Sequence, residues 1–100
     1  MCSSDLESRL RLNYPNPFNA GTELAFDVGA LDADYPATLV VYSALGQRVA
    51  TLFDGVPSAG QQRARWNGRY EDGRAAASGV YFARLTSHRG TQVQRMLLLR

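Results

Sequence analysis

The sequence predicts an all-β protein, an immunoglobulin-like antiparallel β-sandwich of about seven strands. Short runs rich in alternating or β-branched residues recur along the chain, and clusters of Gly, Pro, Asn and Asp separate them at the spacing typical of sandwiches and barrels. No window keeps the apolar i, i+3, i+4, i+7 spacing of a helix over the roughly ten residues that a helix needs. The 100 residues suffice for one domain with a single core.

Three strands are expected in the first half of the chain. Leu10 and Leu12 belong to the end of a strand, and a rigid turn at residues 14–19 follows because its two prolines donate no N–H to a ladder. Thr22–Val28 alternates apolar and polar residues, so one face of this strand should be buried. Ala37–Ser43 is rich in β-branched and aromatic residues, which favour strands.

Four more strands are expected in the second half. Gly46 suits the positive φ of a tight turn, so the strand before it and residues 47–53 should form a hairpin. Residues 61–67 form the next strand. Residues 80–87 and 91–99 make a second hairpin around a turn that contains glycine.

The core must be held by buried area, because a single Cys forms no intrachain disulfide between the sheets. Large apolar side chains at inward positions each contribute about 1.5–3 kcal/mol when they are buried. We expect these anchors to be Leu24, Phe26, Leu39, Val41, Trp66, Tyr81 and Leu85. The facing of the last strand stays open, since Val93, Leu97 and Leu99 compete with Met96 and Leu98.

The charge and hydropathy patterns exclude two classes of partner. Eleven basic residues against nine acidic ones give a net charge of +2, too little to hold a polyanion by field alone. Arg63 and Arg65 alternate on one strand face and could meet Arg84 across the sheet, but without interleaved aromatic residues a solvated face is the simpler expectation. No apolar run approaches the roughly 18 residues of a membrane span. We therefore expect no nucleic acid partner and no membrane insertion.

Catalytic and cofactor sites are not expected either. His88 is the only imidazole and lies in a predicted hairpin turn, without the oriented carboxylate and activated hydroxyl that a triad needs. Residues 71–73, with Asn67 nearby, offer oxygen ligands, but their spacing does not match the repeated Asp pattern of a calcium loop. Turns favour these residues for backbone reasons. We predict no enzyme activity, no metal and no cofactor.

The first six residues are expected to be foreign to the natural protein. Residues 2–6 correspond to one translated frame of a widely used sequencing-adapter tail. Residues 1–6, with the single Cys2, would then be non-native read-through. The domain itself would occupy residues 7–100, and the natural chain would continue upstream of it.

Five motifs, in this order and spacing, resemble a known bacterial module. They are Tyr-Pro-Asn-Pro-Phe-Asn at residues 14–19, the hairpin at 41–49, Trp-Asn-Gly at 66–68 with Asp-Gly-Arg at 72–74, Ala-Ser-Gly-Val-Tyr-Phe at 77–82, and Met-Leu-Leu-Leu-Arg at 96–100. Together they are similar to the type A C-terminal sorting domain of the type IX, or Por, secretion system. They are also similar to the related immunoglobulin-like domain of the flagellar hook-capping protein family. The resemblance covers residues 12–100.

The resemblance implies a non-catalytic C-terminal signal of a larger exported protein. A Sec signal would take the parent to the periplasm, and this domain would direct it through the outer-membrane type IX translocon, leaving the cargo secreted or at the cell surface. The implied partners are that translocon, its C-terminal-signal processing machinery and an upstream cargo domain in the same chain. The residues that match the sorting motifs are Pro15, Asn16, Pro17, Gly46, Gly79, Tyr81, Leu97, Leu98, Leu99 and Arg100.

Three positions depart from the usual motif. Ser43 stands where Asp is usual, Gln47 where Arg or Lys is common, and Arg100 where Lys is more usual. Arginine keeps the positive charge but replaces a compact ammonium by a planar guanidinium, so recognition through an ammonium is not expected here.

Two other functions stay open on the residues alone. The same motifs would serve a structural purpose in an immunoglobulin-like spacer, or hook-cap-like interaction module, of an extracellular protein. An enzyme appendage that contacts polysaccharide would need an exposed aromatic platform, for which Phe53, Tyr70 and Phe82 are the outward candidates. For the sorting role, the apolar terminal run indicates strand addition to a receptor, and a proline at Leu98 should then abolish export while the cargo stays folded.

Overall fold

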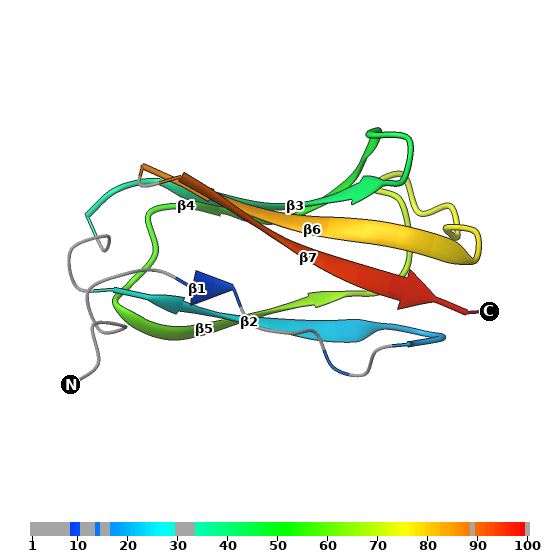
Figure 1. Cartoon of the computed structure of the whole chain (residues 1–100), viewed down its shortest axis with the longest axis horizontal. Coiled ribbons are helices and arrows are strands. Elements are labelled where there is room, and N and C mark those ends of the chain that lie inside the picture. The colour runs from blue at the N-terminus through cyan, green and yellow to red at the C-terminus, as the bar shows by residue number, and fades with distance from the viewer. Residues whose placement is uncertain (1–8, 11–13, 15–16, 30–33, 89, 100) are drawn as a thin grey trace.

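Seven β-strands form two antiparallel sheets that face each other (Figure 1). The structure is a computed structural model, and it describes residues 9–10, 14, 17–29, 34–88 and 90–99. The strands are β1 (Arg9–Leu10), β2 (Thr22–Val28), β3 (Ala37–Ser43), β4 (Arg48–Gly55), β5 (Gly60–Trp66), β6 (Gly79–Ser87) and β7 (Gly90–Leu98). No helix occurs within the described ranges, and hence none that is long and apolar enough to cross a membrane. The predicted all-β sandwich is confirmed.

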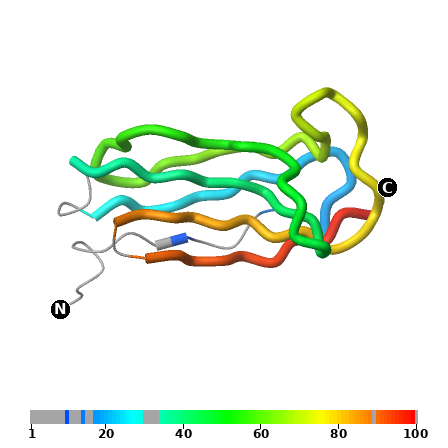
Figure 2. Tube along the Cα trace, turned by 90° about the horizontal axis from the view of Figure 1, so that it is seen from above, coloured from blue at the N-terminus to red at the C-terminus, as the bar shows by residue number. Residues whose placement is uncertain are grey.

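Each sheet joins strands that are distant in the sequence. The three-stranded sheet has the order β1-β2-β5, and the four-stranded sheet has the order β4-β3-β6-β7. The two predicted hairpins are the pairs β3–β4 and β6–β7, whereas β5 pairs with β2 across the intervening hairpin. Seen from above, β7 runs along one long edge of the molecule and β4 along the other (Figure 2).

Alternate side chains of both sheets meet in one core between them. In β2, Leu24 and Phe26 are buried while Glu23 is exposed, as the two-residue period of a strand requires. In the facing sheet Leu39 and Val41 are also buried, but Val40 between them is only 5% exposed, so burial along β3 does not alternate. All seven side chains expected as anchors are at most 5% exposed.

The register between β6 and β7 decides which way the last strand faces. Tyr81 lies opposite Met96 in the ladder, and cross-strand partners share a face of the sheet. Because Tyr81 points into the core, Met96 and Leu98 are fully buried, whereas Val93 and Leu99 are 58% and 51% exposed. The side chains of Met96 and Leu98 therefore form the inner face of β7.

The three outward aromatic candidates do not form a platform, and the outward facing expected for Phe53 and Tyr70 is wrong. Phe53 and Tyr70 pack against the core, and the ring centroid of Phe53 lies 5.6 Å from that of Phe26 in an edge-to-face arrangement. Irregular pairing between β3 and β4 shifts the register beside Leu39, so simple alternation does not predict how β4 faces. Among the three candidates, Phe82 alone lies on the outer face of its sheet.

Arg63, Arg65 and Arg84 do not form the basic stripe that the strand pattern allowed. Arg63 and Arg65 lie on β5 in the three-stranded sheet, and Arg84 lies on β6 in the other sheet. Arg63 instead pairs with Glu23, opposite in charge and on the neighbouring strand, with an N···O distance of 2.9 Å. The two sheets thus separate guanidinium groups that the strand pattern alone allowed to meet.

Candidate functional site

The motif residues that the structure describes converge at one end of the sandwich, on the right in Figure 1. This end contains the chain before β2, the β3–β4 turn, the start of β6 and the end of β7. The residues that meet there are Pro17, Gly46, Gly79, Tyr81, Leu97, Leu98 and Leu99. The other three motif residues, Pro15, Asn16 and Arg100, lie outside the described residues.

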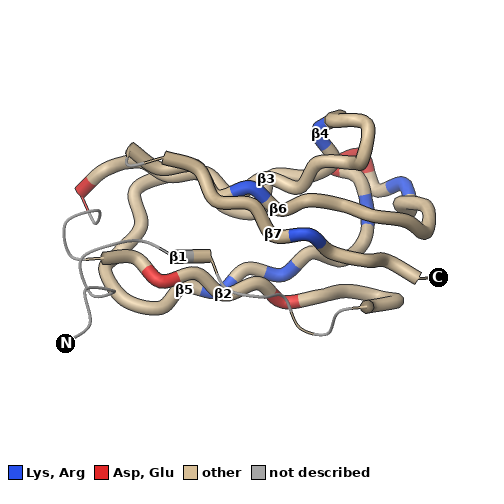
Figure 3. The backbone as a smooth tube through the Cα atoms, in the orientation of Figure 1, with Lys and Arg blue, Asp and Glu red and all other residues tan. Residues whose placement is uncertain are grey.

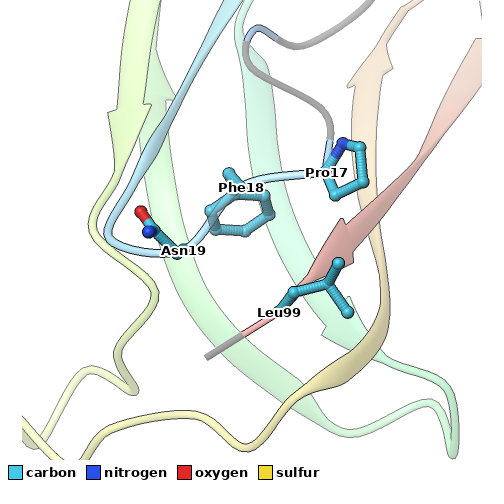
Figure 4. Close-up of a pocket in the computed structure, with 4 residues that line it drawn as sticks. All are labelled: Pro17, Phe18, Asn19 and Leu99. Carbon is cyan, nitrogen blue, oxygen red and sulfur yellow. The ribbon is translucent and has the colours of Figure 1, made fainter.

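The end of β7 is bound to the chain just before β2. Phe18 forms a parallel bridge with Leu98: its N–H donates to the Leu97 carbonyl at 3.0 Å, and its carbonyl accepts from the Leu99 N–H at 2.8 Å. Figure 4 shows Pro17, Phe18 and Asn19 on one side of a hollow and Leu99 on the other. This hollow has a volume of about 370 Å³. We refer to this connection between Phe18 and the end of β7 as the terminal latch.

The terminal latch joins the two sheets, because Phe18 leads into β2 while Leu98 belongs to β7. A second link lies toward the other end of β7, where the Leu10 N–H donates to the Gln92 side-chain carbonyl at 2.7 Å.

The strand addition expected at the apolar terminal run is wrong for the outward backbone groups of Leu97 and Leu99. The outward Leu97 carbonyl and Leu99 N–H already have partners within the chain.

Three aromatic rings support the latch from inside. Phe18, at 3% exposure, meets Trp66 edge to face at 5.5 Å between centroids, and Trp66 meets Tyr81 in the same way at 5.0 Å. The polar atoms of this group are also satisfied: Trp66 Nε1 donates to the Arg69 carbonyl at 3.0 Å, and the Tyr81 hydroxyl donates to the Ala77 carbonyl at 2.7 Å. The motif residue Tyr81 thus acts as part of a rigid base under the latch.

Phe18 is a site residue that no sequence pattern singled out, although the turn that contains it was predicted. The local signal was an aromatic side chain directly after two prolines, which is ambiguous because turn residues are commonly exposed. The partner that makes Phe18 important is Leu98, eighty positions further along the chain. Local patterns carry no information about that pairing.

The β3–β4 turn is held by a hydroxyl where the related motif usually has a carboxylate. Ser43 Oγ accepts from the Leu45 N–H at 3.3 Å and from the Gln47 N–H at 3.2 Å. Its backbone N–H also donates to the Gln47 carbonyl at 2.9 Å. A serine hydroxyl can bond backbone N–H groups as an aspartate does, so the departure at this position keeps the turn.

We expect Gly46→Ala to lower the free energy of unfolding by about 1–2 kcal/mol. Gly46 has a φ of +87°, which the Cβ of alanine disfavours, even though no atom lies within 4 Å of that Cβ position. Gly46→Asn should cost less, since asparagine tolerates positive φ. Urea unfolding monitored by tryptophan fluorescence measures the free energy of unfolding of both variants. Equal stabilities for the alanine and asparagine variants would contradict a backbone origin.

Residues 71–73 and Asn67, which were considered as a calcium loop, use side-chain oxygens of Asp72 and Asn67 to accept hydrogen bonds from nearby backbone N–H groups. Asp72 accepts from the Arg74 N–H at 3.0 Å and from Arg74 Nε at 2.8 Å. The backbone N–H of Arg74, joined by its guanidinium, lowers the pKa of Asp72 below the usual value. Asn67 Oδ1 similarly accepts from the Arg69 N–H at 3.1 Å. Within the described residues, no group of three or more His, Cys, Asp or Glu side chains is placed to hold a metal ion.

His88 occupies the β6–β7 turn at the opposite end of the sandwich. Its side chain is exposed, and its ring centroid lies 3.9 Å from that of Tyr35. Pairing of Ser87 with Gly90 closes the hairpin around it. His88 is therefore remote from the terminal latch and from the motif residues.

Two antiparallel sheets packed over one core, with the edges joined by the terminal latch, define an immunoglobulin-like β-sandwich module. The sequence model of the FlgD Ig-like domain matches residues 14–91. The chain therefore belongs to the FlgD Ig-like domain family. Comparison with curated proteins gave no match.

Two solved structures from Porphyromonas gingivalis contain a similar fold. Dimeric latent PorU matches with a TM-score of 0.70 and 16% identity, over 92% of this chain. PorZ, an essential surface component of the type-IX secretion system, matches with a TM-score of 0.57 and 21% identity, over 88% of this chain. The match covers only 9% of the PorU chain and 11% of the PorZ chain. The likeness at this identity is one of fold.

Proposed function

We propose that this domain is a non-catalytic sorting signal that directs a larger exported protein through the outer-membrane type IX translocon. Its partners would be that translocon and the machinery that processes C-terminal signals, with a cargo domain upstream in the same chain. The cargo would be secreted or displayed at the cell surface, by way of the periplasm. The convergence of the dispersed motif residues at one end of the fold carries this proposal.

Their placement supports recognition of a folded surface. The described residues of the five motifs lie toward the same end, and the terminal latch joins the first motif to the last through Phe18 and Leu98. The side chains of Phe18 and Leu98 are buried, so a receptor would meet the hollow and its rim while these apolar groups stay covered. The fold shared with PorZ, a surface component of a type-IX secretion system, is consistent with this setting.

Export of a fusion protein tests the proposal. The 100-residue chain is placed after a reporter enzyme with a Sec signal, in a bacterium that has a type IX system. We expect Leu99→Asp to reduce reporter in the medium and on the cell surface at least tenfold. Leu99 is 51% exposed and lines the hollow, so the substitution changes the rim and should alter the free energy of unfolding by less than about 1 kcal/mol.

Val56→Asp is the matched control. Val56 is 60% exposed and lies after β4, at the other end of the sandwich, so the same chemical change is made away from the latch. Export of this variant should equal that of the unmodified fusion. Unchanged export of Leu99→Asp, or equal export from a strain without the translocon, would overturn the sorting role.

The second candidate is an immunoglobulin-like structural or interaction module, such as a hook-cap-like spacer of an extracellular protein. Membership of the FlgD Ig-like family favours it directly. The same fusions distinguish the two. A spacer would leave the reporter in the periplasm with or without the translocon, and its deletion from the natural protein would impair assembly or adhesion while the protein still crossed the outer membrane.

A further inference from the structure

The outer face of the four-stranded sheet contains a row of aromatic and arginine side chains. Register places them side by side across four strands, in the order Arg48, Tyr42, Phe82 and Arg95. Tyr42, Phe82 and Arg95 point outward, because they alternate with the core residues Val41, Tyr81 and Met96 along regular ladders. Arg48 is exposed and lies opposite Tyr42 in the ladder, so it shares this face. This row lies on the surface opposite the core.

Arg84 occupies the adjoining row and is held in a defined position. Its guanidinium carbon lies 4.3 Å from the centroid of the Tyr42 ring, and Nη2 donates to the Tyr42 hydroxyl at 2.7 Å. A hollow of about 360 Å³ opens beside it, lined by Tyr42, Phe82, Arg84 and Val93 together with residues of the β3–β4 turn. Stacking and one hydrogen bond pre-organise the guanidinium at the rim of an apolar hollow.

The three strands that lie under the hollow contain arginine residues and no acidic residue. β3, β6 and β7 contain no Asp or Glu, while Arg84 and Arg95 are exposed and mark the blue positions of β6 and β7 in Figure 3. The acidic residue of the fourth strand, Asp54, pairs with Thr38 near the other end of β3. An anionic group that approaches the hollow therefore meets guanidinium groups with no carboxylate in the three strands beneath it.

Apolar groups surround the same hollow and remain open to solvent. Val93, which lines it, is 58% exposed, and Leu45, at the tip of the β3–β4 turn, is 88% exposed. Tyr, Phe and Arg are enriched in protein interfaces, and Tyr and Arg dominate their binding energy. The composition of this face is therefore that of a protein-binding surface with a positive centre.

We propose that this face docks an extended segment of a protein partner that presents an Asp or Glu beside an aromatic or aliphatic side chain. The carboxylate binds the fork of Arg84, and the apolar side chain enters the hollow between Phe82 and Val93. The bond to the Tyr42 hydroxyl uses Nη2, and the guanidinium keeps further N–H groups for a charge-assisted bond to the carboxylate. This surface is separate from the terminal latch, although Tyr42, Gly46 and Phe82 belong to the motif segments. Its binding is measured on the isolated chain, so the result does not depend on export.

A peptide pair tests the proposal with the 100-residue chain. The probe is the acetylated amide Glu-Phe-Glu, and the control is Gln-Phe-Gln, which has the same shape without charge. We expect the acidic peptide to shift the amide resonances of Tyr42, Phe82 and Val93 in ¹⁵N-labelled protein. The neutral peptide should bind about tenfold more weakly, since charge-assisted hydrogen bonds are roughly twice as strong as neutral ones. Added salt should lower the affinity of the acidic peptide and leave the affinity of the neutral peptide unchanged.

Arg84→Gln should remove the same tenfold preference, because it deletes the guanidinium from an exposed position. Arg65→Gln is the matched control, since Arg65 is an exposed strand arginine on the other sheet, and it should bind like the unmodified chain. Equal affinity of the unmodified chain for the two peptides would by itself overturn the proposal. Resonance shifts confined to the three-stranded sheet would also overturn the proposal. If polygalacturonate saturated the protein and the acidic peptide caused no shifts, the partner would be an anionic glycan and the proposal would be wrong.

Discussion

Trp66→Ala should lower the free energy of unfolding by about 3–5 kcal/mol, a large part of the roughly 5–15 kcal/mol that holds a domain folded. Trp66 is 1% exposed and is the middle ring between Phe18 and Tyr81. Alanine removes both ring contacts, leaves a cavity and deprives the Arg69 carbonyl of its indole donor. Because the chain has one tryptophan, unfolding in urea is followed by circular dichroism.

Two control variants test whether the loss of stability is specific to the Trp66 ring or follows from removal of any aromatic side chain. Trp66→Phe keeps a ring in the core and should cost clearly less than alanine. Tyr14→Ala removes a ring that is 81% exposed, and it should change stability by no more than about 0.5 kcal/mol. A cost below about 1 kcal/mol for Trp66→Ala would show that the rings do not support the latch.

Leu98→Pro should destabilise the domain by at least about 3 kcal/mol and so act on the fold before it acts on export. The Leu98 side chain is fully buried, and its backbone pairs with Gly79 in β6. The Leu97 carbonyl and Leu99 N–H face Phe18, so the Leu98 N–H faces β6, and proline has no N–H to place there. Thermal unfolding of the variant and of the unmodified chain measures the difference.

Leu99→Pro is the matched control for this strand. It deletes the N–H that donates to the Phe18 carbonyl at 2.8 Å, while the core side chains stay in place. The expected cost is about 0.5–1.5 kcal/mol, the net value of one hydrogen bond. Similar costs for the two prolines would contradict the assignment of Leu98 to the core ladder. Because Leu98 is fully buried, a loss of export in Leu98→Pro would follow from unfolding of this domain, while the cargo is still expected to stay folded.

Strand positions and much of the core follow from local pattern. Alternation in residues 22–28 identifies Leu24 and Phe26 as inward, and both are buried. Gly46 was expected at a positive φ from its turn, and it has one. These features are encoded over a few neighbouring residues, because the two-residue period of a strand and the steric freedom of glycine are local properties.

The alternation of apolar and polar residues does not predict which side chains face the core when both faces of a strand are apolar or when strand pairing is irregular. The last strand has apolar side chains on both faces, and the ladder with β6 selects Met96 and Leu98 for the core. Register shifts in β4 turn Phe53 inward against expectation. In both cases the deciding partner is on another strand, so no window of the sequence contains the answer.

Local patterns in the chain are sufficient to predict the all-β sandwich, the course of its strands and the residues that form the motifs. Tertiary structure alone decided that Phe18 binds the end of β7, that the motif residues share one end, and that Arg84 stacks on Tyr42 away from Arg63. Side-chain alternation depends on neighbouring residues, whereas the pairing of strands depends on contacts between residues far apart in the chain. A site built from several strands is therefore encoded only in the fold that brings them together.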